Sequence, residues 1–159
     1  MFDMSEPSLL KQLENTWHGT IPVSAFMGIR PLAFDGTEFR VGAPLAPNIN
    51  LHQTMFAGSI YTLCTLCGWG MLWLQQQRAG VSGDIVLAQA EIRYRAPVTA
   101  NPGELIEARV SWPGVSLTPL SEGRRVKVRQ EVELWSHGLC CASFLGVYVS
   151  QPKQEATLS

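Results

Sequence analysis

The sequence predicts a single domain of the α+β class, an antiparallel sheet wrapped around a long central helix. Two observations support this fold. Residues 41–77 contain no Asp, Glu, Lys or Arg and are mostly apolar, as in a helix buried on all sides. The segments on either side alternate apolar and polar residues, which is typical of half-buried antiparallel strands. One sheet covering one helix is the simplest way to bury both patterns.

An N-terminal helix is predicted over residues 5–18, ahead of the first strands. Apolar residues recur there at helical spacing: Leu9, Leu10, Leu13 and Trp17. The helix is expected to end at Gly19. We therefore expect three parts: a helix that packs on the domain (1–22), the domain itself (23–151) and a flexible tail (152–159).

The strands are predicted from alternation and from turn residues. A turn at Asp35-Gly36 joins two short strands into a hairpin ahead of the central helix. The remaining strands are expected after that helix, over residues 85–98, 104–112, 124–135 and 139–149. In the first of these, alternate apolar residues should share the inner face: Val86, Ala88, Ala90, Ile92 and Tyr94.

The central segment, residues 54–78, would be about 36 Å long as a helix, which is enough to cross a bilayer. Hydroxyl side chains at three-residue steps, a final run of Gln and the lack of a flanking basic cluster favour a helix surrounded by protein instead. We therefore predict no membrane partner.

The composition indicates an ordinary cytoplasmic protein. The formal net charge is −1, which provides no basic surface for nucleic acid. The N-terminus lacks the basic and apolar regions of a secretion signal, so we expect a cytoplasmic location and reduced cysteines.

The cysteines do not predict a redox or metal site. Cys64 and Cys67 have C-x-x-C spacing, but they lie midway along the central helix, away from the exposed helix start that activates a thiolate. His137 is close to Cys140 and Cys141, yet no second ligand pair has zinc-like spacing. We expect neither a metal nor an organic cofactor.

Three local motifs are distinctive: N-x-N-x-H-x-T-M-F-A-G-S at 48–59, G-W-G at 68–70 and R-Y-x-A-P at 93–97. In these motifs the chain resembles the thioesterase family typified by the C-terminal domain of YiiD, and the order of its elements resembles the hotdog fold. The resemblance implies a substrate carried by CoA or acyl-carrier protein, with the pantetheine arm entering where two subunits meet. A homodimer, or a tetramer of two dimers, is expected, also because exposed sheet edges tend to pair with a copy.

The chain departs from its more distant hotdog relatives at one position. Thioesterases of the phenylacetyl-CoA hydrolase type carry an Asn, an H-G-G turn at the helix start and an acidic residue further along the helix. Aligned on the turn, Asn50 falls on that Asn, Phe56-Ala57-Gly58 on H-G-G and Thr65 on the catalytic carboxylate. The resemblance therefore implies that the Asn and the helix start are kept while the acid is missing.

The helix start can bind a carbonyl oxygen. Its unpaired N–H groups, around Ala57 and Gly58, would form an oxyanion hole, and small side chains allow a close approach. Asn50 can donate a further hydrogen bond or orient a water; its alternative role is to form the turn.

Two further catalytic candidates have structural alternatives. His52 can act as a general base toward water, or it can simply belong to the turn. Thr65 can position a substrate carboxylate or a water, or its hydroxyl can bond to the preceding helical turn. The other substrate-binding candidates have capping or core roles as alternatives: Asn48, Phe56, Ser59 and Tyr61.

Three functions remain open. Thioester hydrolysis needs a proton acceptor, for which His52 is the nearby candidate. Decarboxylation of a malonyl thioester needs no base, only donors for the enolate oxygen and a dry pocket. Relatives in the family are associated with malonyl-acyl carrier protein decarboxylation, which supplies acetyl-carrier protein for fatty-acid biosynthesis. A non-catalytic acyl-thioester binder is the third hypothesis.

Overall fold

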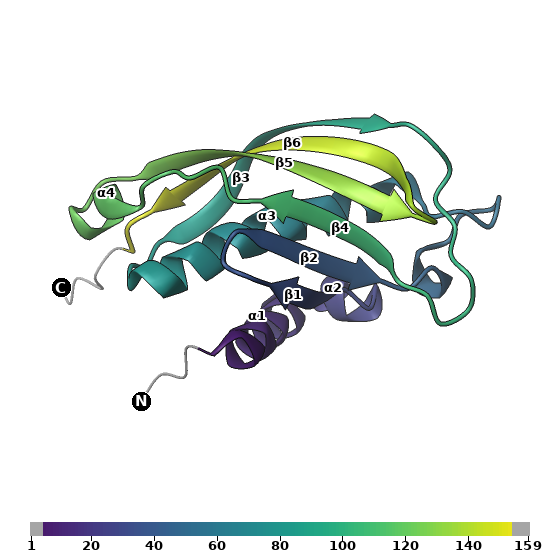
Figure 1. Ribbon diagram of the computed structural model, residues 1–159, viewed down its shortest axis with the longest axis horizontal. Coiled ribbons are helices and arrows are strands. Elements are labelled where there is room, and N and C mark those ends of the chain that lie inside the picture. The colour runs from purple at the N-terminus through teal and green to yellow at the C-terminus, as the bar shows by residue number, and fades with distance from the viewer. Residues whose placement is uncertain (1–4, 154–159) are drawn as a thin grey trace.

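The computed structural model describes residues 5–153 of the chain, which form a curved antiparallel sheet lying over one long helix (Figure 1). The sheet has six strands in the order β1-β2-β4-β5-β6-β3. In chain order, the elements are α1 (Glu6–Thr20), α2 (Pro22–Phe26), β1 (Arg30–Phe34), β2 (Glu38–Ala43), the 3₁₀ turn η1 (Ala46–Asn48), α3 (Ala57–Ala79), β3 (Asp84–Tyr94), β4 (Ile106–Ser111), α4 (Thr118–Ser121), β5 (Val126–Ser136) and β6 (Leu139–Gln151). This arrangement confirms the predicted hotdog architecture.

Helix α3 fills the concave side of the sheet. It is long and apolar enough to cross a membrane by length and composition, but 56% of its most apolar stretch is buried within this chain. Strands β2 to β6 all contact it on the sheet side. The helix therefore occupies the core position that its charge-free sequence predicts.

Glycines allow α3 to approach its neighbours closely. A Cβ atom at Gly68 would lie 2.4 Å from the hydroxyl of Tyr148 on β6, and one at Gly70 would lie 2.8 Å from the rings of Phe39 and Trp17. Any side chain at either glycine would force these buried aromatic groups to move. The small residues of α3 thus set how deeply the helix sits in the sheet.

Helix α1 covers the open side of α3 and the β1–β2 hairpin. Its apolar stripe of Leu9, Leu13 and Trp17 is buried, as the helical spacing predicts. The Trp17 ring lies 6.5 Å from the Phe39 ring, centroid to centroid. At the other end of the chain, β6 runs to Gln151, and residues 154–159 of the predicted flexible tail lie outside the described residues.

In strand β3, the residues that face the core differ from those predicted. The pairing with β6 shifts between Leu87 and Gln89, so a β-bulge interrupts the alternation. Ile85 and Leu87 pack against the core before the bulge, and Ala90 and Ile92 do so after it. The prediction that Val86 and Ala88 share the inner face was wrong: Val86 is 53% exposed and Ala88 is exposed.

Candidate active site

The candidate site is the loop between η1 and the start of α3. Ile49 and Met55 form an isolated antiparallel bridge that closes this loop. Within it, the Asn50 N–H donates to the Thr54 carbonyl at 2.8 Å, and the Gln53 N–H donates to the Asn50 carbonyl at 3.1 Å. Because these bonds occupy residues 50–54, α3 begins at Ala57 rather than at residue 54, where the sequence placed its start.

The side chain of Asn50 is held in one orientation. Its Oδ1 accepts the backbone N–H groups of His52 at 2.9 Å and Thr54 at 3.2 Å. Its Nδ2 donates to the Thr54 hydroxyl at 3.0 Å. An amide nitrogen carries two hydrogens, so one donor remains for a ligand. The turn-forming role of Asn50 is therefore seen directly, and it fixes the direction of the remaining donor.

The first turn of α3 is uncapped by any side chain. The Phe56 carbonyl accepts the N–H groups of Ser59 at 2.9 Å and Ile60 at 3.1 Å. In residues 5–153 no hydrogen bond engages the N–H groups of Ala57 and Gly58. Two backbone donors at the positive end of a 23-residue helix are thus available.

Two aromatic residues frame this helix start. The Phe56 ring folds over Gly58, where an added Cβ would lie 2.4 Å from it. The Tyr94 hydroxyl donates to the Ala57 carbonyl at 3.0 Å and ties the end of β3 to the helix. Thr54 and Tyr94 were not among the predicted site residues, although Tyr94 lies in the R-Y-x-A-P motif.

Three predicted binding residues face the protein interior. Asn48 is 2% exposed, and its Nδ2 donates to the carbonyls of Met27 at 2.9 Å and Pro44 at 2.7 Å, which favours its turn-forming role. Ser59 is 9% exposed. The Tyr61 ring packs edge-on against Phe144, with 5.5 Å between ring centroids. Substrate contacts by these residues remain predictions.

His52 lies exposed in the loop, and its imidazole makes no hydrogen bond to the described part of the chain. The backbone bond to Asn50 anchors the residue in the turn and leaves the ring free to reach solvent or a ligand. The general-base role of His52 stays a prediction.

Thr65 lies about 12 Å further along α3 than Ala57, two helical turns away. No hydrogen bond joins it to Asn50 within residues 5–153, so a single chain does not bring these two predicted catalytic residues together. The Thr65 hydroxyl is buried and has no partner in this described part, whereas the Thr62 hydroxyl bonds back to the Gly58 carbonyl at 2.9 Å. The alternative role of Thr65, a bond to the preceding turn, is therefore not observed.

Two residues of the sheet bind α3 next to Thr65. The Tyr148 hydroxyl donates to the Thr65 carbonyl at 2.6 Å, and the Gln130 Nε2 donates to the Gly68 carbonyl at 2.6 Å. Both side chains are fully buried, and burial raises the pKa of Tyr148 well above its ordinary value. Tyr148 therefore stays protonated and donates to the α3 backbone at Thr65, the residue whose side-chain hydroxyl has no partner within residues 5–153.

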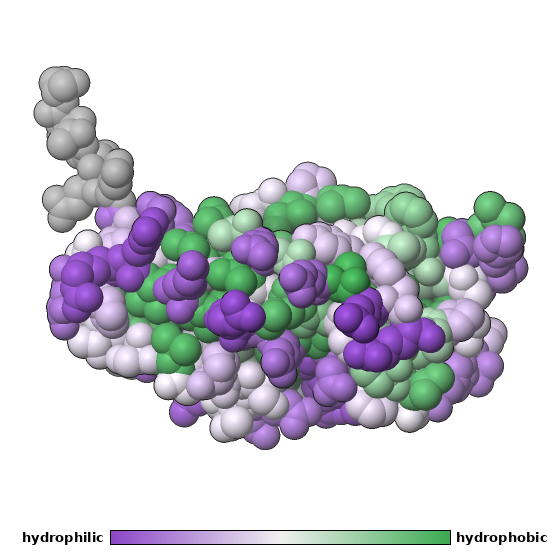
Figure 2. All heavy atoms as spheres, turned by 90° about the horizontal axis from the view of Figure 1, so that it is seen from above, coloured by the Kyte–Doolittle hydropathy of each residue, from purple (hydrophilic) through white to green (hydrophobic). Residues whose placement is uncertain are grey.

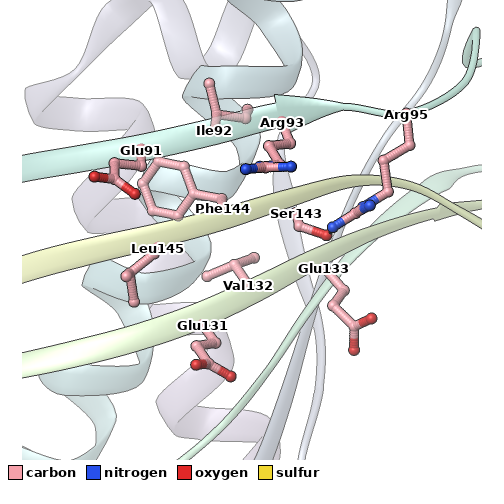
Figure 3. A pocket seen from close by; sticks show the side chains of 10 residues that line it. All are labelled: Glu91, Ile92, Arg93, Arg95, Glu131, Val132, Glu133, Ser143, Phe144 and Leu145. Atoms are coloured by element: carbon pink, nitrogen blue, oxygen red, sulfur yellow. The ribbon is translucent and has the colours of Figure 1, made fainter.

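The site is open in a single chain. Leu51 is 85% exposed and Phe56 is 55% exposed, so apolar side chains beside the helix start lie uncovered. A hollow of about 550 Å³ lies elsewhere, on the outer face of the sheet over β3, β5 and β6 (Figure 3). In the described single chain, the helix start beside Asn50 is therefore uncovered.

The two cysteines of α3 lie in the core. Burial raises the pKa of the Cys64 and Cys67 thiols, which favours their protonated form. Among residues 5–153 no group of three or more His, Cys, Asp or Glu side chains is arranged to hold a metal ion.

Comparison with known proteins agrees with this geometry. Residues 10–152 match the model of the family described as "Putative thioesterase (yiiD_Cterm)". The "putative thioesterase from Shewanella oneidensis" is 60% identical, with a TM-score of 0.88 over 92% of this chain and 99% of that one. PaaI of E. coli, from the phenylacetic acid degradation operon, shares the fold at 15% identity, with a TM-score of 0.69 over 94% of this chain and 97% of its own.

The motif at the helix start, the six-stranded sheet around α3 and the family match across residues 10–152 lead to one assignment. The chain belongs to the YiiD C-terminal thioesterase family of hotdog-fold proteins.

Proposed function

We propose that this chain is an enzyme of thioesterase type that acts on acyl groups carried by CoA or acyl-carrier protein. One observation carries the proposal: the start of α3 offers two unengaged backbone N–H groups, and the neighbouring Asn50 has a spare amide hydrogen held in a fixed direction. Such preorganised donors stabilise an oxyanion, and removing one typically costs 10²–10³-fold in rate.

In the hydrolytic reaction, the thioester carbonyl oxygen would accept these hydrogen bonds while a water attacks the carbonyl carbon. His52 would take a proton from that water, and the C–S bond would then break with its electron pair going to sulfur. The protonated His52 would return the proton to the sulfur, which releases a free acid and a thiol. The exposed imidazole beside Asn50 supports this role.

A malonyl-acyl carrier protein decarboxylase is the second candidate. Thr65 occupies the helix position where relatives of the phenylacetyl-CoA hydrolase type carry their acid, and its hydroxyl is buried without a partner in the described chain. In this reaction the bond between the α-carbon and the carboxylate breaks, CO₂ leaves, and the electron pair forms an enolate on the thioester oxygen. Protonation of the α-carbon then gives the acetyl thioester. The donors at the helix start stabilise the enolate without any base.

We further propose that the functional unit is a homodimer in which a second subunit covers the loop around Asn50. The uncovered side chains of Leu51 and Phe56 and the exposed edge strand β3 support this arrangement. A cytoplasmic location also remains a proposal, based on the sequence alone.

Measuring free thiol and CO₂ separately, with malonyl and simple acyl thioesters on both carriers, tests these functions. Thiol alone identifies the hydrolase, CO₂ alone the decarboxylase, and binding without either product identifies a non-catalytic acyl-thioester binder. Asn50→Ala should lower either activity, whereas His52→Ala should abolish only hydrolysis. His18→Gln, on α1, is the matched histidine control, because the sequence places His18 outside the Asn50 loop and its ring bonds to the Ile29 carbonyl within residues 5–153.

A further inference from the structure

The R-Y-x-A-P motif at residues 93–97 lies at the end of β3 and meets the chain that leads into α3. Within the motif, the Tyr94 hydroxyl donates to the Ala57 carbonyl at 3.0 Å. Directly after it, the Val98 carbonyl accepts the Met55 N–H at 2.8 Å. The segment 94–98 therefore bonds to the backbone on both sides of the point where α3 begins.

Strand β6 holds this segment in place. The Arg95 N–H donates to the Cys141 carbonyl at 2.7 Å, and the Ala96 N–H donates to the same carbonyl at 3.2 Å. The Arg95 side chain adds a bond from its Nε to the Ser143 hydroxyl at 2.8 Å. The backbone that follows Tyr94 is thus fixed on the sheet, so the phenol hydroxyl extends from a rigid support.

Strand alternation directs Tyr94 toward the helix. Its neighbours Arg93 and Arg95 line the hollow on the outer face of the sheet (Figure 3). Figure 2, which views the molecule from above, shows hydrophilic side chains among apolar surface on this face. Because successive side chains of a strand point to opposite faces, Tyr94 shares the inner side with Ile92, which packs against the core.

The carbonyl that Tyr94 binds belongs to the same peptide group as the Gly58 N–H, because each planar peptide group joins the carbonyl of one residue to the N–H of the next. A hydrogen bond accepted by the carbonyl oxygen polarises the whole group, and it strengthens a bond donated by the N–H by about 10–30%. A carbonyl oxygen has two lone pairs, so the Tyr94 bond does not compete with the helical hydrogen bonds of α3. Tyr94 thus makes the free Gly58 N–H a stronger donor.

We infer that Tyr94 is a positioning residue for the reaction, which orients and strengthens the Gly58 N–H that a thioester oxygen would accept. The inference rests on the proposed function, since it concerns the same oxyanion site. Tyr94 acts through the peptide group between Ala57 and Gly58 and touches no reacting atom. Its effect grows as negative charge develops on the thioester oxygen, so it should appear in kcat more than in KM.

The phenol suits this role because it stays a donor. Burial raises the pKa of the Tyr94 hydroxyl above its ordinary value, so the hydroxyl keeps its proton at neutral pH. Phenylalanine at this position would keep the ring and lose only the donor. Tyr94→Phe therefore isolates the contribution of the hydrogen bond.

Tyr94→Phe in the full-length chain tests the inference in two ways. Strengthening by about 10–30% of a donor that contributes roughly 10²–10³-fold predicts a fall in kcat of about two- to eightfold, with KM changed less. In the free protein, the amide ¹⁵N resonance of Gly58 should shift, because its peptide group loses the bond. Tyr148→Phe is the matched control for this resonance, since it removes the equivalent bond to the Thr65 carbonyl. It should shift the Leu66 amide and leave Gly58 unmoved.

The infrared frequency of a ¹³C-labelled thioester carbonyl separates this inference from the proposed function. It should fall on binding to the wild type and fall less on binding to Tyr94→Phe, with circular dichroism showing that the variant is folded. A wild type that neither turns over thioesters nor shifts the carbonyl would refute the proposed function, and the role of Tyr94 with it. A wild-type shift that Tyr94→Phe reproduces at unchanged kcat would overturn the role of Tyr94 alone, as would an unmoved Gly58 resonance or a rise in KM at unchanged kcat.

Discussion

Gly68→Ala should destabilise the protein, although alanine is the better helix former. The new Cβ would lie 2.4 Å from the Tyr148 hydroxyl and 2.7 Å from two atoms of its ring. Overpacking of a core costs about 1–3 kcal/mol, and displacing the Tyr148 hydroxyl from the Thr65 carbonyl costs about 1 kcal/mol more. The gain in helix propensity offsets about 1 kcal/mol. The expected net loss is about 1–3 kcal/mol.

Thermal or denaturant unfolding measures this loss, which corresponds to about 3–9 °C in Tm for a chain of this size. Gly19→Ala in α1 is the matched control, because no atom lies within 4 Å of its added Cβ; it should stabilise by about 0.5 kcal/mol. In a Tyr148→Phe background, Gly68→Ala should cost about 1 kcal/mol less, since the hydrogen bond is already absent. Stabilisation by Gly68→Ala equal to that of the control would refute the packing of α3 against Tyr148.

Three further predictions concern the loop that precedes α3 and the cysteines within α3. Thr54→Val removes the hydroxyl that accepts the Asn50 amide hydrogen, so turnover should fall about tenfold and urea unfolding should show a stability loss of about 1 kcal/mol. Unchanged turnover would show that Thr54 does not position Asn50. Asn48→Ala should destabilise the protein by about 1–3 kcal/mol, since the Met27 and Pro44 carbonyls lose their donor, and an unaffected unfolding midpoint would contradict this bonding. Cys64 and Cys67 should resist iodoacetamide at about pH 8, which is near the ordinary thiol pKa. Burial raises their pKa values, so the reactive thiolate stays scarce until the chain unfolds. Mass spectrometry of the native protein detects any labelling.

The large features of the fold could be predicted because each leaves a local pattern. The charge-free stretch 41–77 indicates a helix buried on all sides, and α3 is that helix. The alternation in residues 126–136 gives β5 its buried and exposed faces without error. In β3 the alternation fails, because a bulge changes its phase and the small residues Ala88 and Ala90 fit either face.

The site could be predicted only in part. The motif around Asn50 indicates a turn before a helix, and the side-chain bonds that fix the amide span four residues or fewer. Contacts between distant residues leave no such pattern. Tyr94 reaches the Ala57 carbonyl across 37 residues, and Tyr148 reaches the Thr65 carbonyl across 83. Both depend on how the sheet wraps around α3.

The central claim is that Asn50 and the start of α3 polarise the carbonyl of a bound acyl thioester. Isotope-edited infrared spectroscopy of a ¹³C-labelled thioester carbonyl measures this polarisation directly, whether the reaction is hydrolysis or decarboxylation. The account predicts that the stretching frequency falls on binding to the wild type and falls much less on binding to Asn50→Ala. A carbonyl that binds both proteins with the frequency it has in water would contradict it.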